Sequence, residues 1–337
     1  MLKDAMVGFE LYQPTDIDTA VDLMSRHGAN GWVLAGGYDS LDWFKDRVKT
    51  PTAVIDLQGI DELRGIRQED GETVIGAMTS LSEVAANPLV VNAYSIVSDA
   101  CRQVASPQIR NAATIGGNVC QDTRCWYYRY GVDCYRAGGN TCYAAAPGAM
   151  NREHALFGAS RCVAVSPSDV ATALVAIDAQ MVVRSARGQR VIPAAEFFMG
   201  PAVDITRMTV LEPGDLLAAI RLPADWGGAD FYFEKVTDRK SWDFALVSVA
   251  AAFRMTSGPD TAARTVEDVR IVAGAVDCVP RRFPEVERLV RSAVRSAQVA
   301  EEAGLIAVSD AEPLDFNHFK IPLVQNLVKR AIRGDNT

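Results

Sequence analysis

The residues with the clearest chemical potential are cysteines that crowd one part of the chain. The chain has seven cysteines, and five of them, Cys120, Cys125, Cys134, Cys142 and Cys162, fall between residues 120 and 162. In a chain without a recognisable secretion signal, such a group more often binds a metal or does redox work than forms disulfides. The segment shows no sustained helical or strand period, and an irregular stretch of this length usually needs something to pin it. Metal ligation would supply that constraint.

Four thiolates on an irregular loop can converge on one point, because no helix or strand repeat holds them apart. A [4Fe–4S] cluster takes four cysteine ligands of this kind. Zinc also accepts four cysteines, but its structural sites usually contain Cys-x-x-Cys pairs, and this sequence has none. The spacing therefore favours an iron–sulfur cluster, with a four-cysteine zinc site as the alternative.

Two short loops contain adjacent glycines, which let backbone N–H groups approach an anion without a Cβ in the way. The first, Ala35 to Ser40, reads AGGYDS and follows a short apolar run; the second, Thr114 to Asn118, reads TIGGN. Neither loop is the GxGxxG fingerprint or a phosphate-binding P-loop. One such glycine pair is usually only a turn, but two together could hold the phosphates and ribityl chain of a dinucleotide.

The elements that must position these loops follow a mixed order of strands and helices. A first helix is expected from an N-cap at Thr15 to Gly28, because apolar residues recur at helical spacing between them. Other apolar runs and periods predict strands at 32–34, 52–57, 73–77, 162–165, 181–183, 216–222, 231–236, 245–253 and 269–273. Helices are expected at 82–101, 169–178, 282–303 and 316–333. The fold class is therefore α+β, with a linker at 224–230.

Size and charge exclude several classes of protein. A chain of 337 residues suits two or three domains. Its net charge of −8 argues against nucleic-acid binding, which needs a basic stripe. No apolar run approaches the roughly 18 residues of a membrane span, and the N-terminus does not read as a signal peptide. We expect a cytoplasmic protein, although a partner chain could carry it to the periplasm by co-export.

At this point the sequence resembles a known family, the FAD subunits of molybdenum hydroxylases. The segments that carry the resemblance read LAGGYDSL from Leu34, SPQIRNAATIGGN from Ser106 and FEKVTDRKSWDFALVSVA from Phe233. The resemblance implies a p-cresol-methylhydroxylase-like FAD-binding fold of two α/β subdomains plus a smaller α+β C-terminal domain. It places these parts at 1–60, 61–225 and 226–337, with an insertion at about 119–162.

The same resemblance implies which residues contact FAD. In the two loops they are Val33, Leu34, Ala35, Gly36, Gly37, Tyr38, Asp39 and Ser40, followed by Ala113, Thr114, Ile115, Gly116, Gly117 and Asn118. Lys235 matches a lysine near the flavin, and Asp169 matches an acidic residue that contacts the cofactor. Tyr38 departs from the family, where many members have a small Thr or Gln. Trp126 is added as a cofactor contact, although the run Trp126–Tyr128 could instead shield a cluster or simply pack.

The cysteines resemble the cluster-binding insertion of the 4-hydroxybenzoyl-CoA reductase β subunit and of periplasmic-type aldehyde oxidoreductases. In that pattern the first ligand follows an arginine, which matches Arg124-Cys125. The implied ligands of a [4Fe–4S] cluster are Cys125, Cys134, Cys142 and Cys162, with Cys120 left as a spare. Cys101 and Cys278 are expected to be small buried residues. His154 either faces the cluster or flavin, or makes a structural hydrogen bond.

The function that the resemblance implies is electron transfer within a larger oxidoreductase. A partner large subunit would carry the molybdenum cofactor, and a small subunit would carry [2Fe–2S] clusters, in a heterotrimer or a dimer of heterotrimers. This chain would pass electrons between those clusters and an external acceptor or donor through FAD and [4Fe–4S]. Two alternatives remain: a self-contained FAD-dependent oxidase or dehydrogenase, for which no cap domain is evident, and a non-catalytic assembly protein with a four-cysteine zinc site.

Overall fold

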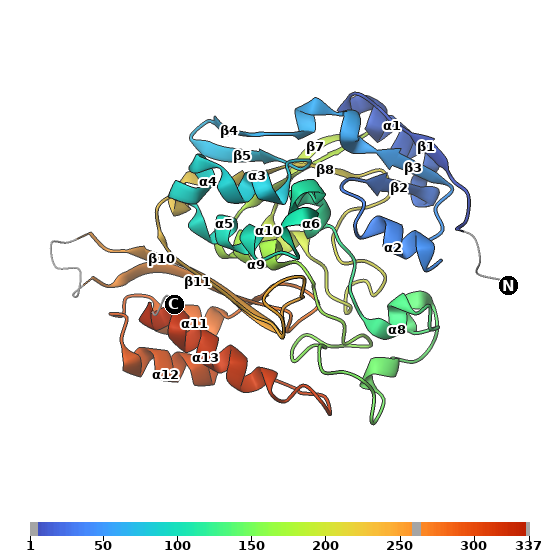
Figure 1. The fold of residues 1–337 in the computed structure, drawn as a ribbon. Coiled ribbons are helices and arrows are strands. Elements are labelled where there is room, and N and C mark those ends of the chain that lie inside the picture. The colour runs from blue at the N-terminus through green and yellow to red at the C-terminus, as the bar shows by residue number, and fades with distance from the viewer. Residues whose placement is uncertain (1–5, 258–263, 335–337) are drawn as a thin grey trace.

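Three sheets and the helices around them make up the part of the chain that the structure describes (Figure 1). The computed structural model describes residues 6–257 and 264–334. The three-stranded and five-stranded sheets lie together in the upper part of Figure 1, and the C-terminal hairpin and helices lie below them. Among the described residues, no helix combines the length and the apolar character that crossing a membrane requires.

The first sheet is parallel, with the order β1-β3-β2, and its strands are β1 (Glu10–Tyr12), β3 (Ala53–Asp56) and β2 (Gly31–Leu34). Parallel strands need crossover connections. Here α1 (Ile17–His27) and η1 (Gly28–Asn30) connect β1 to β2, and α2 (Ser40–Lys45) connects β2 to β3. The expected N-cap at Thr15 is wrong by one residue. The Asp16 carboxylate accepts from Thr19 N at 2.8 Å and so caps the first turn.

The second sheet is antiparallel and is interrupted by a long excursion of the chain. Its order is β4 (Ile66–Glu69), β5 (Glu72–Gly76), β8 (Leu216–Leu222), β6 (Gln180–Ser185) and β7 (Gly188–Pro193). Both β5 and β6 pair with β8, so residues 77–179 leave the sheet after β5 and return to it at β6. The second glycine loop and the cysteine segment both belong to this excursion.

Short helices begin the excursion, and the single helix expected at 82–101 is wrong. Three helices replace it, because Asn87-Pro88 and Tyr94 interrupt the backbone: α3 (Leu81–Ala86), α4 (Pro88–Ala93) and α5 (Ser95–Arg102). Asn87 ends α3 and caps α4, and Pro88 takes the first helical position, where its missing N–H costs nothing. The excursion also contains α6 (Pro107–Ala112), α7 (Ile115–Val119) and α9 (Asp169–Ala176), and α10 (Ala194–Phe197) follows β7.

The cysteine segment has little regular structure, as its sequence predicts. It contains only α8 (Trp126–Arg129), η4 (Tyr135–Ala137) and η5 (Tyr143–Ala145) between long loops. The strand expected at 162–165 does not form. Val163 O accepts from Ala155 N at 2.9 Å, but no ladder continues from this contact.

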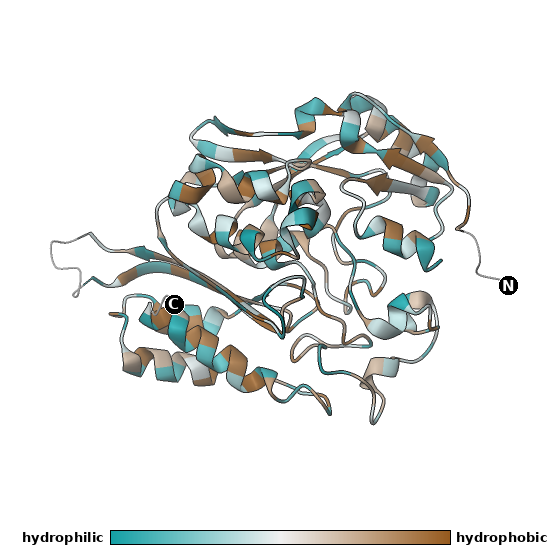
Figure 2. Cartoon of the chain, viewed as in Figure 1, coloured by the Kyte–Doolittle hydropathy of each residue, from teal (hydrophilic) through white to brown (hydrophobic). Residues whose placement is uncertain are grey.

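The third sheet is antiparallel and buried on both faces. Its order is β12 (Arg281–Arg282), β11 (Val266–Gly274), β10 (Val247–Met255) and β9 (Asp230–Val236). Helices α5 and α9 contact one face. On the other face lie α11 (Pro284–Val290) and α13 (Lys320–Arg333), and α12 (Ala297–Ile306) packs against these two helices. This explains why residues 247–253 are all buried. In Figure 2, hydrophobic stretches alternate with hydrophilic ones along the helices of this layer. The helix expected at 282–303 is two helices, because the chain turns at Ser292 with φ +66°.

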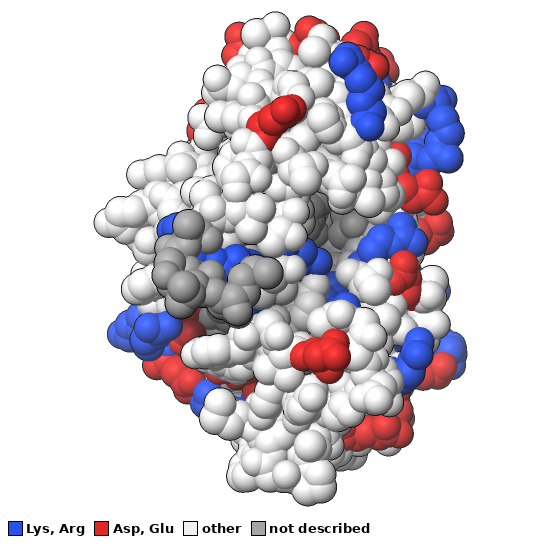
Figure 3. Space-filling model, turned by 90° about the vertical axis from the view of Figure 1, so that its right-hand side faces the viewer, with Lys and Arg blue, Asp and Glu red and all other residues white. Residues whose placement is uncertain are grey.

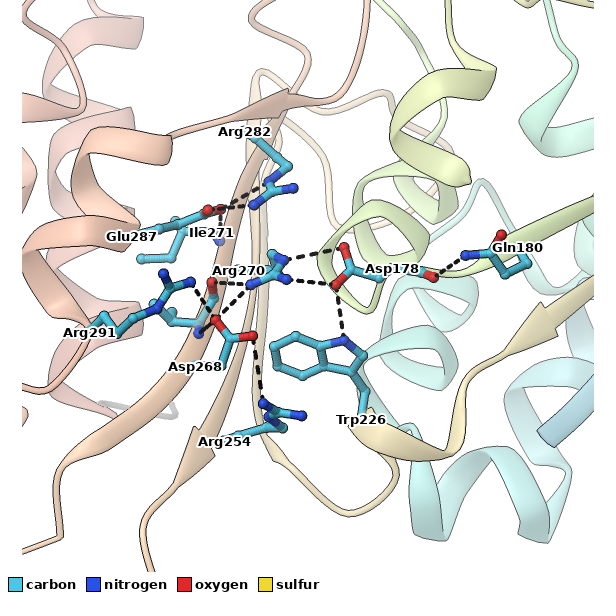
Figure 4. A network of polar contacts seen from close by, with 11 residues as sticks. Asp178, Gln180, Trp226, Arg254, Asp268, Arg270, Ile271, Arg282, Glu287 and Arg291 are labelled. Atoms are coloured by element: carbon cyan, nitrogen blue, oxygen red, sulfur yellow. Dashed lines mark hydrogen bonds and ion pairs between the residues drawn. The ribbon is translucent and has the colours of Figure 1, made fainter. Parts of the chain in front are cut away.

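A polar network joins the third sheet to the end of α9 and to Trp226, which lies just before β9 (Figure 4). Asp178, just beyond α9, binds Arg270 of β11 with a closest approach of 2.9 Å and accepts from Trp226 Nε1 at 3.2 Å. The Arg270 guanidinium also lies 5.2 Å from the centre of the Trp226 ring. Trp226, in η6 (Ala224–Trp226), is buried. The segment 224–230, which was expected to be a linker, is therefore held by the contacts of Trp226 with Asp178 and Arg270.

Candidate functional site

A cavity of about 1280 Å³ lies where the first sheet, the excursion and the β9–β10 connection meet. Both glycine loops line it, together with the start of the cysteine segment, residues 238–239 and residues 242–246. On the face shown in Figure 3, the surface is hollowed and basic side chains gather in a band across its middle. The basic residues of the cavity wall are Lys45, Arg47, Arg124, Arg129 and Arg239.

The two glycine loops pack directly against each other and against the second sheet. A Cβ on Gly36 would lie 2.5 Å from Ala112 O, and a Cβ on Gly116 would lie 2.8 Å from both Cβ and O of Ala77. Gly37 has φ +82°, a conformation that other residues rarely adopt. These glycines are therefore required by the backbone arrangement itself, and they bring the two loops to one wall of the cavity.

Hydrogen bonds fix the second loop from behind. Thr114 Oγ1 caps α7 by accepting from Gly117 N at 3.1 Å. Asn118 Oδ1 accepts from Ser168 Oγ at 2.7 Å, and Ser168 Oγ accepts from Ala171 N at the start of α9. The loop thus has a defined shape before any ligand binds, which lowers the entropy cost of binding.

Most of the residues predicted to contact FAD line this cavity. They are Val33, Ala35, Gly36, Gly37, Tyr38, Asp39, Ser40, Ala113, Thr114, Gly116, Gly117, Asn118, Trp126 and Asp169. Three others do not line it. Leu34 packs with Trp43 and Phe44, and Ile115 is fully buried in the main core.

Lys235, the third, lies behind the wall and holds Asp169. Its Nζ donates to Asp169 Oδ2 at 2.6 Å and to the carbonyl oxygens of Gln103 and Asp243, each at 2.9 Å. All three ammonium hydrogens are therefore used within the protein. Burial raises the pKa of Asp169, and the positive charge of Lys235 opposes that rise. Lys235 positions an acidic residue of the cavity wall.

Asp39, at the end of the first loop, binds two arginines of the cysteine segment. Arg124 Nη1 donates to Asp39 Oδ1 at 2.9 Å, and Arg129 donates to the same oxygen. Trp43 Nε1 donates to Asp39 Oδ2 at 3.0 Å, and the Arg129 guanidinium lies 3.7 Å from the Trp43 ring centre. Sequence reasoning assigned Asp39 a ligand contact but not this connection.

A second, small cavity of about 20 Å³ is lined by four cysteines, and they are the four that were predicted as ligands: Cys125, Cys134, Cys142 and Cys162. Four tyrosines complete much of its wall: Tyr127, Tyr128, Tyr135 and Tyr143. Cys125 and Ala164 line both cavities, whereas Cys120 lines only the large one. Within residues 6–257 and 264–334, no three or more His, Cys, Asp or Glu side chains are arranged to hold a metal ion.

Two further residues lie beside these cysteines. Cys278 packs against Cys162, and its Sγ donates to Ala164 O at 2.7 Å. It is buried as expected, but no sequence signal could bring a residue of the C-terminal part to Cys162. His154 Nε2 lies 3.3 Å from Cys125 Sγ, and His154 also lines the large cavity. Burial, aided by the positive charge of Lys320, lowers the pKa of His154 to about 4, so the ring is neutral at pH 7.

Comparison with known proteins decides the family. The domain described as "FAD binding domain in molybdopterin dehydrogenase" matches residues 7–225, and "CO dehydrogenase flavoprotein C-terminal domain" matches residues 232–334. The chain belongs to the FAD-binding subunits of molybdenum hydroxylases. As a member of this family it is an oxidoreductase subunit that binds FAD. The cavity fits that cofactor, because it exceeds the usual 300–1,000 Å³ of a small-molecule site and both glycine loops line it.

Individual molybdenum-hydroxylase subunits resemble the chain over nearly its whole length. The aldehyde oxidoreductase FAD-binding subunit PaoB of Escherichia coli is 34% identical, covering 93% of this chain and 94% of its own. The carbon monoxide dehydrogenase medium chain of Hydrogenophaga pseudoflava is 29% identical, covering 97% and 96%. A solved structure of carbon monoxide dehydrogenase from Hydrogenophaga pseudoflava matches with a TM-score of 0.75, 27% identity and 97% coverage of both chains. The predicted fold class is thereby confirmed.

Proposed function

We propose that this chain transfers electrons between the [2Fe–2S] clusters of a partner and an external acceptor or donor, using FAD and one [4Fe–4S] cluster. The observation that carries the proposal is that the two cavities share Cys125 and Ala164 as wall residues. The two cavities therefore adjoin at these two residues. A flavin takes up two electrons together and can exchange them singly with a cluster.

The proposed FAD contacts are the cavity-lining residues of both glycine loops, together with Trp126 and Asp169. The close contacts of Gly36 and Gly116 support this, because they leave backbone rather than side chains facing the cavity. Lys235 acts indirectly by holding Asp169 at 2.6 Å. Leu34 and Ile115 are proposed to support the loops from the core rather than to touch the cofactor. For the chain as a whole, the proposed parts are 1–60, 61–225 and 226–337.

The proposed cluster ligands are Cys125, Cys134, Cys142 and Cys162. Their support is chemical and spatial: four thiols line one cavity, and four tyrosines make up much of the rest of its wall. At about 20 Å³ the cavity is too small for a cluster, so the sulfurs must move apart on binding. Only short helical turns and loops lie between them, and metal binding commonly supplies the free energy that orders such a segment.

Cys120 remains the proposed spare. Its side chain lines the large cavity and packs against the main core, away from the four-cysteine cavity. Burial raises the pKa of its thiol to about 12, so Cys120 is an unreactive neutral thiol at pH 7. This difference in surroundings gives the test below a matched control.

The proposed partners are a large subunit with the molybdenum cofactor and a small subunit with [2Fe–2S] clusters, in a heterotrimer or a dimer of heterotrimers. The support is that full-length relatives are named as a medium chain or as an FAD-binding subunit, which implies further chains. Hydroxylation would then take place on the large subunit. The proposed compartment is the cytoplasm, or the periplasm after co-export with a partner.

Metal analysis of the purified full chain with its absorption spectrum tests this function. We expect about four irons and one FAD per chain, a broad iron–sulfur absorption under the flavin bands, and an EPR signal after reduction. Cys125→Ser should lose the iron, and Cys120→Ser should keep it. Loss only in Cys120→Ser would exchange the roles of these two residues. Flavin without iron would favour the self-contained oxidase, and one zinc without flavin would favour the assembly protein.

A further inference from the structure

A large aromatic side chain is left uncovered in the wall of the large cavity. Trp242 lies on the connection between β9 and β10, lines the cavity and is 66% exposed. We propose that the indole of Trp242 binds FAD by stacking against one of its two planar rings, the isoalloxazine or the adenine. This inference rests on the FAD part of the proposed function and does not require a cluster.

The backbone holds Trp242 in a conformation that a bulky side chain rarely adopts. Its φ is +55°, in the left-handed region. Trp242 N donates to Ala105 O at 2.8 Å, and Ala105 has a positive φ as well, +44°. Both residues line the cavity. Two strained residues other than glycine thus meet beside one cavity, and backbone strain of this kind is concentrated at ligand-binding sites.

Hydrogen bonds fix the loop on both sides of Trp242. Arg239 Nη2 donates to Trp242 O at 2.7 Å, and Arg239 N donates to Asp243 Oδ2 at 3.0 Å. Asp243 Oδ1 accepts from Phe244 N at 3.1 Å, and Asp243 O accepts from Lys235 Nζ at 2.9 Å. The indole is therefore exposed on a backbone that is already held in place, which lowers the entropy cost of covering it with a ligand.

The same contacts place Trp242 beside the acidic residue of the cavity wall. Lys235 Nζ donates to the backbone oxygen of Asp243, the residue after Trp242, and also to Asp169 Oδ2 at 2.6 Å. Asp169 and Trp242 both line the cavity in which FAD is proposed to bind. FAD has two planar aromatic rings, and stacked aromatic rings stabilise a complex beyond the area that they bury. An exposed indole in this wall is suited to that contact.

The rate at which the FAD-loaded full chain releases FAD on dilution, followed by flavin absorbance, tests the inference. Trp242→Leu should release FAD about two- to tenfold faster, which corresponds to the loss of one aromatic pair. Trp242→Phe keeps an aromatic ring and should stay closer to wild type. Phe316→Leu, at an exposed aromatic residue of the C-terminal part, should not change the rate. An unchanged rate in Trp242→Leu would overturn the inference.

Trp242→Gly separates cofactor binding from a structural role. Glycine adopts a positive φ without strain. The urea midpoint of this variant should therefore not fall, although FAD should leave faster than from wild type. A lower midpoint with an unchanged rate of FAD release would show that Trp242 supports the fold and not the cofactor.

FMN and ADP identify the ring, because FMN carries the isoalloxazine and ADP carries the adenine. Each is titrated into the full chain after removal of FAD. Weaker binding of FMN alone to Trp242→Leu would assign the stack to the isoalloxazine, and weaker binding of ADP alone would assign it to the adenine. Unchanged binding of both would overturn the stack. A wild-type chain that binds no FAD would overturn the proposed function as well, whereas FAD without iron would remove only its cluster.

Discussion

Arg124 Nη1 lies 2.9 Å from Asp39 Oδ1, and this ion pair joins the first glycine loop to the residue before Cys125. Arg129 binds the same carboxylate oxygen from α8, only four residues beyond Cys125. One acidic side chain therefore fixes the flavin-side loop and the start of the cysteine segment together. A substitution that displaces either segment should therefore also displace the other, because both are bound to Asp39.

Replacing Asp39 by asparagine should weaken both segments. The asparagine amide would keep an acceptor for Trp43 Nε1 but would leave two partly buried guanidinium groups without a negative partner. Hydrogen bonds to charged groups contribute about 1.5–3 kcal/mol each, so we expect a loss of about 1–3 kcal/mol in the free energy of unfolding. FAD and iron content should fall together. Urea unfolding, flavin absorbance and metal analysis measure these three quantities.

Asp22→Asn is the matched control for this substitution. Asp22 also pairs with an arginine, Arg26, but both side chains are more than half exposed. Exposed pairs of this kind contribute little to stability because water and salt screen them, and neither cofactor should be lost. An Asp39→Asn protein that loses no more stability than Asp22→Asn, with both cofactors retained, would show that Asp39 does not connect the two segments.

Two glycine substitutions should separate packing from cofactor binding. A Cβ on Gly36 would lie 2.5 Å from the backbone oxygen of Ala112, which cannot move without displacing the second loop. Gly36→Ala should therefore cost about 1–3 kcal/mol of stability, as overpacking does, and should lower FAD occupancy. A Cβ on Gly117 would meet Thr114 Oγ1 at 3.0 Å and Ala35 Cβ at 3.6 Å, and both are side-chain atoms. Gly117→Val should then lose FAD with a much smaller loss of stability.

The readouts for this pair are flavin content per chain and the urea midpoint. Gly200→Ala is the control, because a Cβ there meets nothing within 4 Å. Full FAD retention in Gly117→Val would contradict the assignment of the second loop to the cofactor. Unchanged stability in Gly36→Ala would contradict the close contact between the loops.

The sequence predicted local features well where the signal was local. Buried strands such as β3 and β8 appear where apolar runs indicated them, and helix α9 appears where helical spacing did. It failed at 82–101, where helical spacing continued through Asn87-Pro88 although the backbone breaks there. It also failed at 162–165, where an apolar run is buried by packing around Cys278 rather than by strand pairing.

The candidate site also has features that the sequence predicted and contacts that it did not. Both glycine loops and the four-cysteine set were visible in the sequence, because residue type and spacing carry the chemistry. The role of Lys235 behind Asp169, and the approach of Cys278 to Cys162, depend on strands and turns that are distant in sequence. Such contacts leave no periodic signal, so only the folded chain reveals them.

Losing a proposed cluster ligand should expose the cysteine segment to proteases. Ordering a residue costs about 1–2 kcal/mol, and the long loops of 125–162 have few regular hydrogen bonds to offset this cost. Cys134→Ser and Cys142→Ser should therefore lose iron and be cleaved within 125–162, as seen by limited proteolysis and mass spectrometry. Cys101→Ser, in the buried core, should keep the iron. Cleavage that does not depend on iron content would show that the cluster does not order this segment.

Lys320 gives the chain a pH dependence whose sign can be stated. Its side chain is fully buried and donates to His154 O and Ala275 O at 3.0 and 2.8 Å. Burial lowers the pKa of Lys320 from 10.5 to about 7. Between these two values the unfolded chain holds a proton that the folded chain has released. Stability from this group therefore rises with pH across that window, by at most about 1.4 kcal/mol per pH unit.

The measurement is the free energy of unfolding of wild type minus that of Lys320→Met, taken at several values between about pH 6 and pH 10. The substitution removes the titrating group and leaves an apolar side chain of similar length in the buried site. We expect the difference to change little below about pH 7 and then to shift in favour of wild type as the pH rises. The same difference for Lys240→Met, at an exposed lysine, should stay flat. A flat Lys320→Met difference across the window, or one that shifts in favour of the variant, would mean that Lys320 keeps its charge in the folded chain and is stabilised there by its two carbonyl partners.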